Sequence, residues 1–177
     1  MKEFQEKDSY ESSFFVPEEK VIYTLVIGDG VGVKAKEDGS GDVSMMIPLI
    51  ATNADNQTTS IFINFPAHPD EEWKIKGPRT TLTQIASVCG LYKRLEKDFP
   101  GEQEIDAPEI LKALCLWLPG KTFDGRFKLT KSKDGEKTFT RLNLIAKAGA
   151  GKKQAAGQAA AGANGKTKAG GGGTEWD

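Results

Sequence analysis

The sequence predicts a mostly β domain with a helical insert, followed by a flexible C-terminal tail. Apolar residues alternate with polar ones between residues 20 and 65, follow a helical period between 80 and 118, and alternate again from 121 to 147. Between Gly149 and Thr174 the chain has no Val, Ile, Leu, Phe, Tyr, Trp or Met. Such a segment cannot bury enough apolar surface to offset the entropy lost on ordering, so we expect a tether.

The first elements are an acidic arm and a long strand. Residues 1–19 carry two bases and six acids, and they have no regular apolar period. Residues 20–36 read as a strand that Gly28, Gly30 and Gly32 should bend, because glycines inside a strand usually mark a bulge or a corner. Residues 38–41 then predict a hairpin loop.

Two further strands are expected at residues 42–52 and 58–65, joined by a polar loop. Pro48 lies inside the first of these strands. Because proline has no backbone N–H to donate, we expect an edge or a bulge at that position.

The helical insert should contain two helices. The first is predicted over residues 80–97, with a threonine as its N-cap. For the second, Asp106 can cap the N-terminus, Pro108 suits the first turn, and Glu109 completes a capping box. This helix should stop before Pro119.

A closing hairpin is predicted from residues 121–132 and 137–147, around the tight-turn pair Asp134-Gly135. Five strands with a helix before the last pair are the secondary-structure elements of a small Greek-key barrel of the OB type. We therefore expect an arm at residues 1–19, an OB-like domain at 20–148 and a disordered tail at 149–177.

The sequence contains no convincing catalytic, metal-binding or nucleotide-binding motif. His68 is the only histidine and lies far from a zinc-type spacing with Cys89 and Cys115, which we expect to be reduced and buried. The glycines at 28, 30 and 32 do not match a dinucleotide-binding loop. We therefore expect no catalytic residues, no metal and no cofactor, and a non-enzymatic protein. With neither a signal peptide nor a long apolar run, a cytoplasmic location is expected (host cytoplasm if viral).

The closing hairpin carries the main functional signal. Residues 121–153 contain ten bases and three acids, and aromatic residues lie between them. Single-stranded nucleic acid suits this pattern, because cations follow the phosphates while rings stack on bases. By period two we place Phe127 in the core, and we expect Phe123 and Phe139 to be the stacking rings. The predicted DNA-binding residues are Trp73, Lys74, Lys76, Arg79, Lys121, Phe123, Arg126, Lys128, Lys131, Phe139 and Arg141.

Plainer interpretations exist for these features. The hairpin can be an ordinary amphipathic one with a solvated lysine face, and Trp73, expected in a loop, can be a lid on the core. At the C-terminus, Glu175-Trp176-Asp177 suits a partner-docking peptide, although the whole tail can be merely solubilising.

The segment Leu118-Pro119-Gly120-Lys121-Thr122-Phe123 enters the closing hairpin, and Thr140-Arg141-Leu142-Asn143 leaves it. With these motifs, the layout of about residues 20–147 resembles phage-encoded single-stranded-DNA-binding proteins of the OB-fold type. Proteins of this type often end in a flexible leash with an acidic, aromatic tip, and Glu175-Trp176-Asp177 is similar to a minimal version. The resemblance implies single-stranded-DNA binding in replication, recombination or repair, with replication or recombination proteins recruited by the tip. The alternatives are a virion or scaffold adaptor and, more weakly, a duplex-DNA or RNA regulator.

Overall fold

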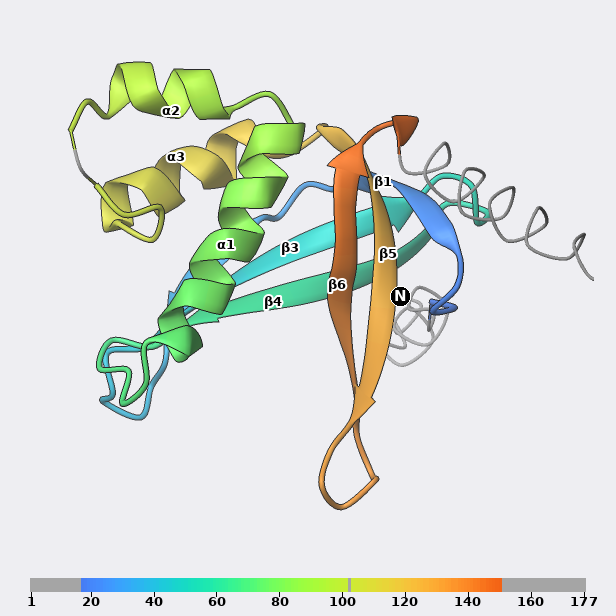
Figure 1. Ribbon diagram of the computed structural model, residues 1–177, viewed down its shortest axis with the longest axis horizontal. Helices are drawn as coiled ribbons and strands as arrows, with labels where there is room; N and C mark the ends of the chain where they lie inside the picture. Colours follow the sequence, from blue (N-terminus) through green and yellow to red (C-terminus); the bar gives the residue numbers. More distant parts are fainter. Residues whose placement is uncertain (1–16, 102, 151–177) are drawn as a thin grey trace, which may run out of the picture.

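One antiparallel sheet of six strands dominates the structure, a computed structural model that describes residues 17–101 and 103–150. Three helices lie between the fourth and fifth strands (Figure 1). The prediction of a mostly β domain with a helical insert is confirmed. Among the described helices, none is long and apolar enough to cross a membrane.

The predicted first strand is divided into β1 (Ile22–Ile27) and β2 (Gly32–Ala35). Both pair with the same edge of β3 (Val43–Ala51), β1 at the end of that strand and β2 at its start. Gly30 lies in the break between them with a φ of 90°, a backbone conformation that residues other than glycine rarely adopt. The predicted bend is confirmed, and it separates two short strands.

Pro48 lies in an internal strand and not at an edge of the sheet, but the predicted irregularity is present, because residues 28–31 between β1 and β2 lie opposite only Ile47 and Pro48 of β3. The other edge of β3 pairs along its whole length with β4 (Gln57–Phe65). The Pro48 carbonyl accepts a hydrogen bond of 2.9 Å from the Gly28 N–H. The backbone N and C=O of a strand residue project to the same side of the strand. The Pro48 nitrogen, which has no hydrogen to donate, therefore faces the break between β1 and β2, where the ladder is interrupted.

The predicted helix over residues 80–97 is two helices, α1 (Trp73–Val88) and α2 (Tyr92–Asp98). Gly90 separates them, with a φ of 74°. A glycine in this left-handed conformation commonly ends a helix. The apolar spacing continues across the break and therefore conceals it in the sequence.

α3 (Pro108–Trp117) begins with the predicted proline and ends before Gly120, as expected. The predicted capping box is wrong, because the N-cap is Ala107 and no side chain caps the helix. The Asp106 carboxylate instead accepts a hydrogen bond of 2.8 Å from Arg79 Nε. This ion pair ties α1 to the segment that precedes α3.

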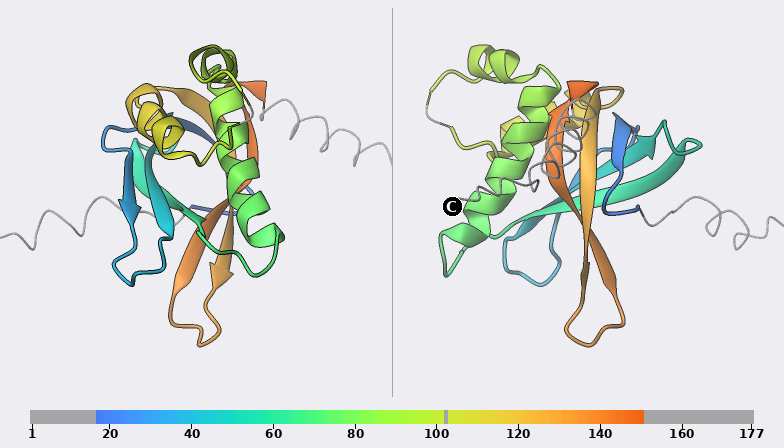
Figure 2. Two further views of the ribbon diagram at one scale, coloured as in Figure 1. Left: turned by 90° about the vertical axis from the view of Figure 1, so that its left-hand side faces the viewer. Right: turned by 45° about the vertical axis from the view of Figure 1, so that its right-hand side comes forward.

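The predicted closing hairpin is confirmed as β5 (Thr122–Lys131) and β6 (Thr138–Lys147). Gly135 in its turn has a φ of 76°. β5 also pairs with β1, and the tip of the hairpin projects away from α2 and α3 (Figures 1 and 2).

The sheet does not close into a barrel. Its strand order is β2-β3-β1-β5-β6, with β4 on the other edge of β3, and the described residues of β4 and β6 do not pair with each other. α1 packs against both of these strands (Figure 2). A helix therefore occupies the place where a closed barrel would have a ladder.

The core contains both phenylalanines of β5. Phe127 and Phe123 are each 0% exposed, which confirms the prediction for Phe127 and shows that Phe123 cannot be a stacking ring. Residues four apart in a strand lie on the same face. Phe123 pairs directly with Leu25 of β1, so it lies beside another fully buried residue on the core-facing side of the sheet.

We predict that Phe123→Ala and Phe127→Ala both destabilise the domain. Truncating a buried phenylalanine leaves a cavity and typically costs about 3–5 kcal/mol. Urea unfolding followed by tryptophan fluorescence measures the change in the free energy of unfolding. Phe139→Ala is the control, because this ring is half exposed. A Phe123→Ala variant as stable as the unmodified protein would contradict the core assignment.

Candidate functional site

A groove of about 680 Å³ lies where the uncovered edges of β4 and β6 approach each other beside α1. We call it the seam groove. Its walls are residues 60–64 of β4 and residues 138–142 of β6. On α1 it is lined by Trp73, Lys74, Gly77, Pro78 and Thr81. The groove therefore exists because the sheet is open at this place.

Three exposed aromatic rings from three different elements line the seam groove. Phe62 is 62%, Trp73 64% and Phe139 51% exposed. Among the described aromatic residues, only Tyr92 on α2 is comparably exposed, at 45%, and it is not in the groove. Exposed rings gathered around one concave surface are suited to stacking on flat ligands.

Sequence reasoning missed Phe62, although a signal was present. In β4 the buried residues Ile61 and Ile63 alternate with Ser60, Phe62 and Asn64. By period two, a phenylalanine between two polar residues lies on the exposed face. Phe62 also pairs directly with Met46 of β3, so a second apolar side chain lies beside it.

Trp73 was expected in a loop, and the structure places it instead in the first turn of α1. Pro78 lies inside this helix, where proline removes one helical hydrogen bond. The Trp73 ring points away from the core with 64% exposure, which excludes the interpretation of a lid. Its indole N–H donates to the Glu71 carboxylate.

Two of the three cations of α1, Lys74 and Arg79, form ion pairs with acids. Lys74 Nζ lies 2.5 Å from Asp70 Oδ1, 3.9 Å from Glu71 Oε1 and 5.7 Å from the centre of the Trp73 ring. Arg79 pairs with Asp106 and Glu104, outside the groove. Lys76 is exposed on the same helix and also lies outside the groove lining. Of these three predicted phosphate contacts, Lys74 alone lines the groove.

The cations of the hairpin differ from those of α1 in that several of them share one face and form no ion pair with a described acid. Lys128 is directly opposite Arg141, and Thr130 is directly opposite Phe139, so these side chains share one face of the hairpin. Among the described residues, no acid forms an ion pair with Lys128, Lys131 or Arg141. Arg126 lies further along this face, half buried, and Lys121 precedes the strand at the end away from the tip. The structure thus brings Phe139 and Arg141 to the seam groove, with Lys128 beside them.

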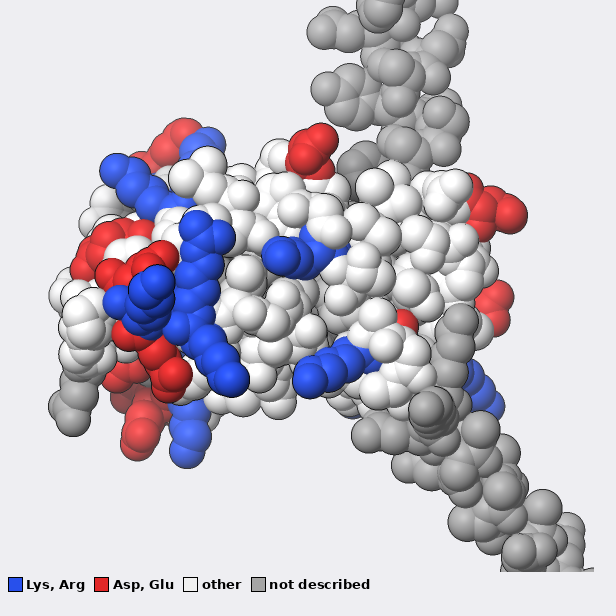
Figure 3. Space-filling model, turned by 90° about the horizontal axis from the view of Figure 1, so that it is seen from above, with Lys and Arg blue, Asp and Glu red and all other residues white. Residues whose placement is uncertain are grey.

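At the end of the molecule away from the hairpin tip, acids and bases are interspersed around the helices (Figure 3). This arrangement does not produce a field of one sign there. The unpaired cations of the hairpin are therefore the more favourable place for an anionic chain.

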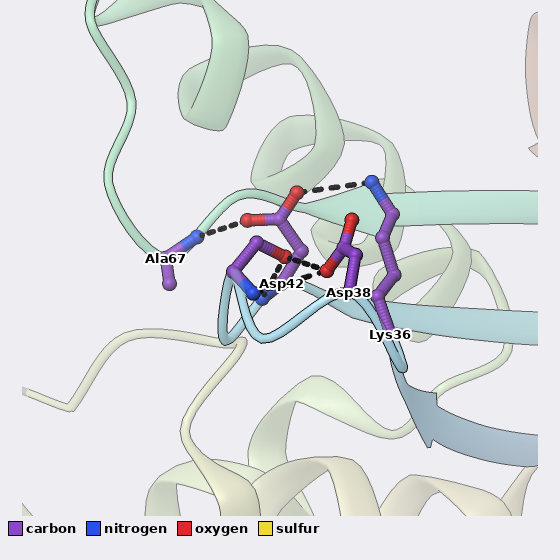
Figure 4. A network of polar contacts seen from close by, with 5 residues as sticks. Lys36, Asp38, Asp42 and Ala67 are labelled. Atoms are coloured by element: carbon purple, nitrogen blue, oxygen red, sulfur yellow. Dashed lines mark hydrogen bonds and ion pairs between the residues drawn. The ribbon is translucent and has the colours of Figure 1, made fainter.

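A network of polar contacts holds the segment that leads to Trp73 (Figure 4). The Asp42 carboxylate in the β2–β3 loop accepts the Ala67 N–H at 3.0 Å and the Lys36 ammonium at 2.9 Å. Asp38 accepts the N–H and the hydroxyl of Ser40 in the same loop. The hydrogen bond from Ala67 therefore ties this loop to the start of the segment between β4 and α1.

Other reactive groups give no sign of a catalytic centre. In the residues that the structure describes, no cluster of His, Cys, Asp and Glu could hold a metal ion. Cys89 and Cys115 are both free thiols and only partly buried. Burial raises the pKa of Cys89 to about 11, so its thiol stays protonated at neutral pH and is a weak nucleophile.

Comparisons with protein-family models and with curated proteins find no match. The predicted partner-binding residues Glu175, Trp176 and Asp177 lie outside the described residues. Among the predicted site residues, those that the structure describes lie on α1 and on the hairpin, around and near the seam groove.

We predict that the Ala67 amide reports the ionisation of Asp42. The pKa of Asp42 is lowered chiefly by the hydrogen bond from the Ala67 N–H and then by Lys36. A carboxyl whose pKa is lowered on folding stabilises the protein above the unfolded pKa, and this contribution is lost as the pH falls through the folded value. The Ala67 amide shift in an NMR titration should therefore change with a midpoint below 3.8, the ordinary value. The Asp42→Asn variant should lack this titration, and a midpoint above the ordinary value would contradict the assignment.

Proposed function

We propose that this protein binds single-stranded DNA without strong sequence preference and acts in phage DNA replication, recombination or repair. The observation that carries this proposal is the gathering of Phe62, Trp73 and Phe139 around one groove, with Arg141 at its wall and Lys128 beside it. A groove that combines stacking rings with cations is typical of proteins that bind single strands.

The chemistry of the seam groove favours a single strand over a duplex. In a duplex the faces of the bases are stacked on each other, and rings of a protein can reach them only after unstacking. A single strand exposes these faces, and every base has one, so stacking gives affinity with little sequence preference. The proposed path runs along the groove, with the phosphates toward Arg141 and Lys128.

We further propose that the fold is an open form of the Greek-key barrel of the OB type. Support comes from β1 and β2, which follow one edge of β3 like a single bent strand, while β1 also pairs with β5. The helices lie between the third and fourth strands of such a barrel, counted with β1 and β2 as one. Recruitment of replication or recombination proteins by Glu175-Trp176-Asp177 remains part of the same proposal, on the basis of the sequence alone.

The proposed function predicts tighter binding of oligo-dT than of a blunt duplex, measured by fluorescence polarisation. The affinity should fall steeply with salt, because each neutralised phosphate releases condensed counterions, with a log–log slope of about −0.7 per contact for single strands. Equal affinity for the duplex, or an affinity that does not respond to salt, would contradict the proposal. A complete lack of nucleic-acid binding would favour the adaptor alternative.

Three alanine variants test the groove directly. Phe62→Ala, Trp73→Ala and Phe139→Ala should each weaken oligo-dT binding by about 1–3 kcal/mol, the typical value of one stacked base. Their free energies of unfolding should change little, because exposed side chains contribute little to stability. Tyr92→Ala is the matched control, since this ring is exposed outside the groove. If all four variants bind equally well, the seam groove is not the binding site.

A further inference from the structure

The outer part of the closing hairpin leaves the sheet at a bulge. Pairing between β1 and β5 ends with Ile22 opposite Arg126, although β5 continues to Lys131. At the same point the register between β5 and β6 shifts, between Arg126 and Phe127. A bulge bends and twists a strand pair, so it sets the direction in which the hairpin continues. We call residues 127–142 the outer ribbon; its turn projects away from α2 and α3 (Figures 1 and 2).

Polar contacts hold the turn of the outer ribbon. The Ser132 N–H donates to the Lys137 carbonyl at 2.7 Å, and the Lys137 N–H donates to the Ser132 hydroxyl at 3.0 Å. The Asp134 carboxylate accepts the Ser132 hydroxyl and, at 3.1 Å, the Glu136 N–H. The two strands are therefore kept together up to the turn, and the lysines beside it project from an ordered backbone.

The outer ribbon is basic and exposed. It contains five bases and two acids. Residues 130, 131 and 133–139 are exposed. None of the lysines of the outer ribbon forms an ion pair with an acid in the described part of the chain. A cluster of such cations on a projecting element attracts an anionic partner.

The end of the outer ribbon has cations without rings, unlike the seam groove. Residues 130–138 include Lys131, Lys133 and Lys137 and no aromatic residue. Binding of a single strand uses rings that stack on its exposed bases. A duplex keeps its bases stacked on each other and presents its phosphates to a protein, and contacts with phosphates need only donors and positive charge. The composition of this end therefore favours the backbone of a duplex.

The dimensions of the outer ribbon also suit a duplex. The major groove of B-DNA is about 12 Å wide and about 8.5 Å deep, and it admits a two-stranded β-ribbon. Two paired strands lie about 4.8 Å apart, and with side chains on both faces the ribbon is roughly 10 Å across. From Thr130 to Asp134 it extends roughly 13 Å at the usual rise per strand residue, which exceeds the depth of the groove.

We propose that the end of the outer ribbon binds the backbone of duplex DNA through Lys131, Lys133 and Lys137, so that the protein recognises the junction between a single strand and a duplex. The single-strand half of this inference rests on the proposed function, but the duplex contact does not. Thr138 and Phe139 line the seam groove, and Lys137 comes directly before them. The two DNA contacts therefore adjoin, and one DNA strand continues from the groove into the duplex.

A junction substrate tests this inference in the full-length protein. Fluorescence polarisation compares oligo-dT with the same oligo-dT extended by a stem–loop duplex. The junction should bind at least about fivefold more tightly at low salt, and its log–log salt slope should be steeper by about 0.9 for each duplex phosphate contact. Equal affinities for the two substrates would overturn the inference. Oligo-dT that does not bind at all would instead contradict the proposed function.

A pair of charge variants locates the duplex contact. The double variant Lys133→Gln, Lys137→Gln should remove most of the preference for the junction and leave the affinity for oligo-dT nearly unchanged, because neither lysine lines the seam groove. The matched control is Lys93→Gln, Lys97→Gln, which removes the same charge from exposed positions of α2 and should keep the preference. A hairpin variant that retains the preference, or an equal loss in both variants, would show that the ribbon is not the duplex contact.

A second measurement uses duplex alone and so separates this inference from the proposed function. Addition of a blunt duplex at low salt should shift the backbone amide signals of residues 131–137 more than those of residues 60–64 of β4. High salt should reverse the shifts, because the contact is electrostatic. Ribbon signals that do not move, or that move no more than those of β4, would overturn the duplex contact, whatever the oligo-dT measurements show.

Discussion

The pairing of β1 with two neighbours is the constraint on which the rest of the structure depends. Leu25 lies opposite Ala51 of β3 on one side and opposite Phe123 of β5 on the other, and all three side chains are fully buried. Without β1, the unit of β3 and β4 and the closing hairpin would share no ladder. Because β1 is only six residues long, it joins them at one end and leaves their far ends apart.

This short junction explains the seam groove. The uncovered edges of β4 and β6 approach each other without pairing, and α1 packs against both strands. Leu82 and Ile85 of α1 are buried in the core, while Trp73, Gly77 and Thr81 of the same helix line the groove. The same helix therefore contributes one face to the core and another to the open groove.

Electrostatics divide the cations into two kinds. On α1, Lys74 pairs with Asp70 and Arg79 with Asp106, so part of their charge is already neutralised. The outer hairpin is a projecting element (Figure 1), and no described acid forms an ion pair with its Lys128 or Arg141. Cations without such partners are the ones that gain most from a phosphate, because no existing ion pair is lost when it binds.

Local signals in the sequence determined the turns and the strand periods. Gly30, Gly90 and Gly135 adopt the left-handed backbone conformation that glycine tolerates best, and two of them mark breaks that the sequence predicted. The alternation in β5 placed Phe127 in the core correctly. The same parity applies to Phe123, but its position near the end of the strand suggested exposure, and only the tertiary structure shows that it lies in the core beside Leu25 of β1.

The seam groove is formed by residues that are distant in the sequence. Phe62, Trp73 and Phe139 come from separate elements, and no local pattern states that they meet. Whether the sheet closes was also beyond the sequence, because closure depends on how far the whole sheet twists and on the helix that lies in the seam. The sequence by itself determined the strand periods and the tight turn of the closing hairpin, since these depend on near neighbours, but it did not reveal the first turns of α1 or its separation from α2. The tertiary structure alone decided which exposed rings share a groove, since that depends on packing across the chain.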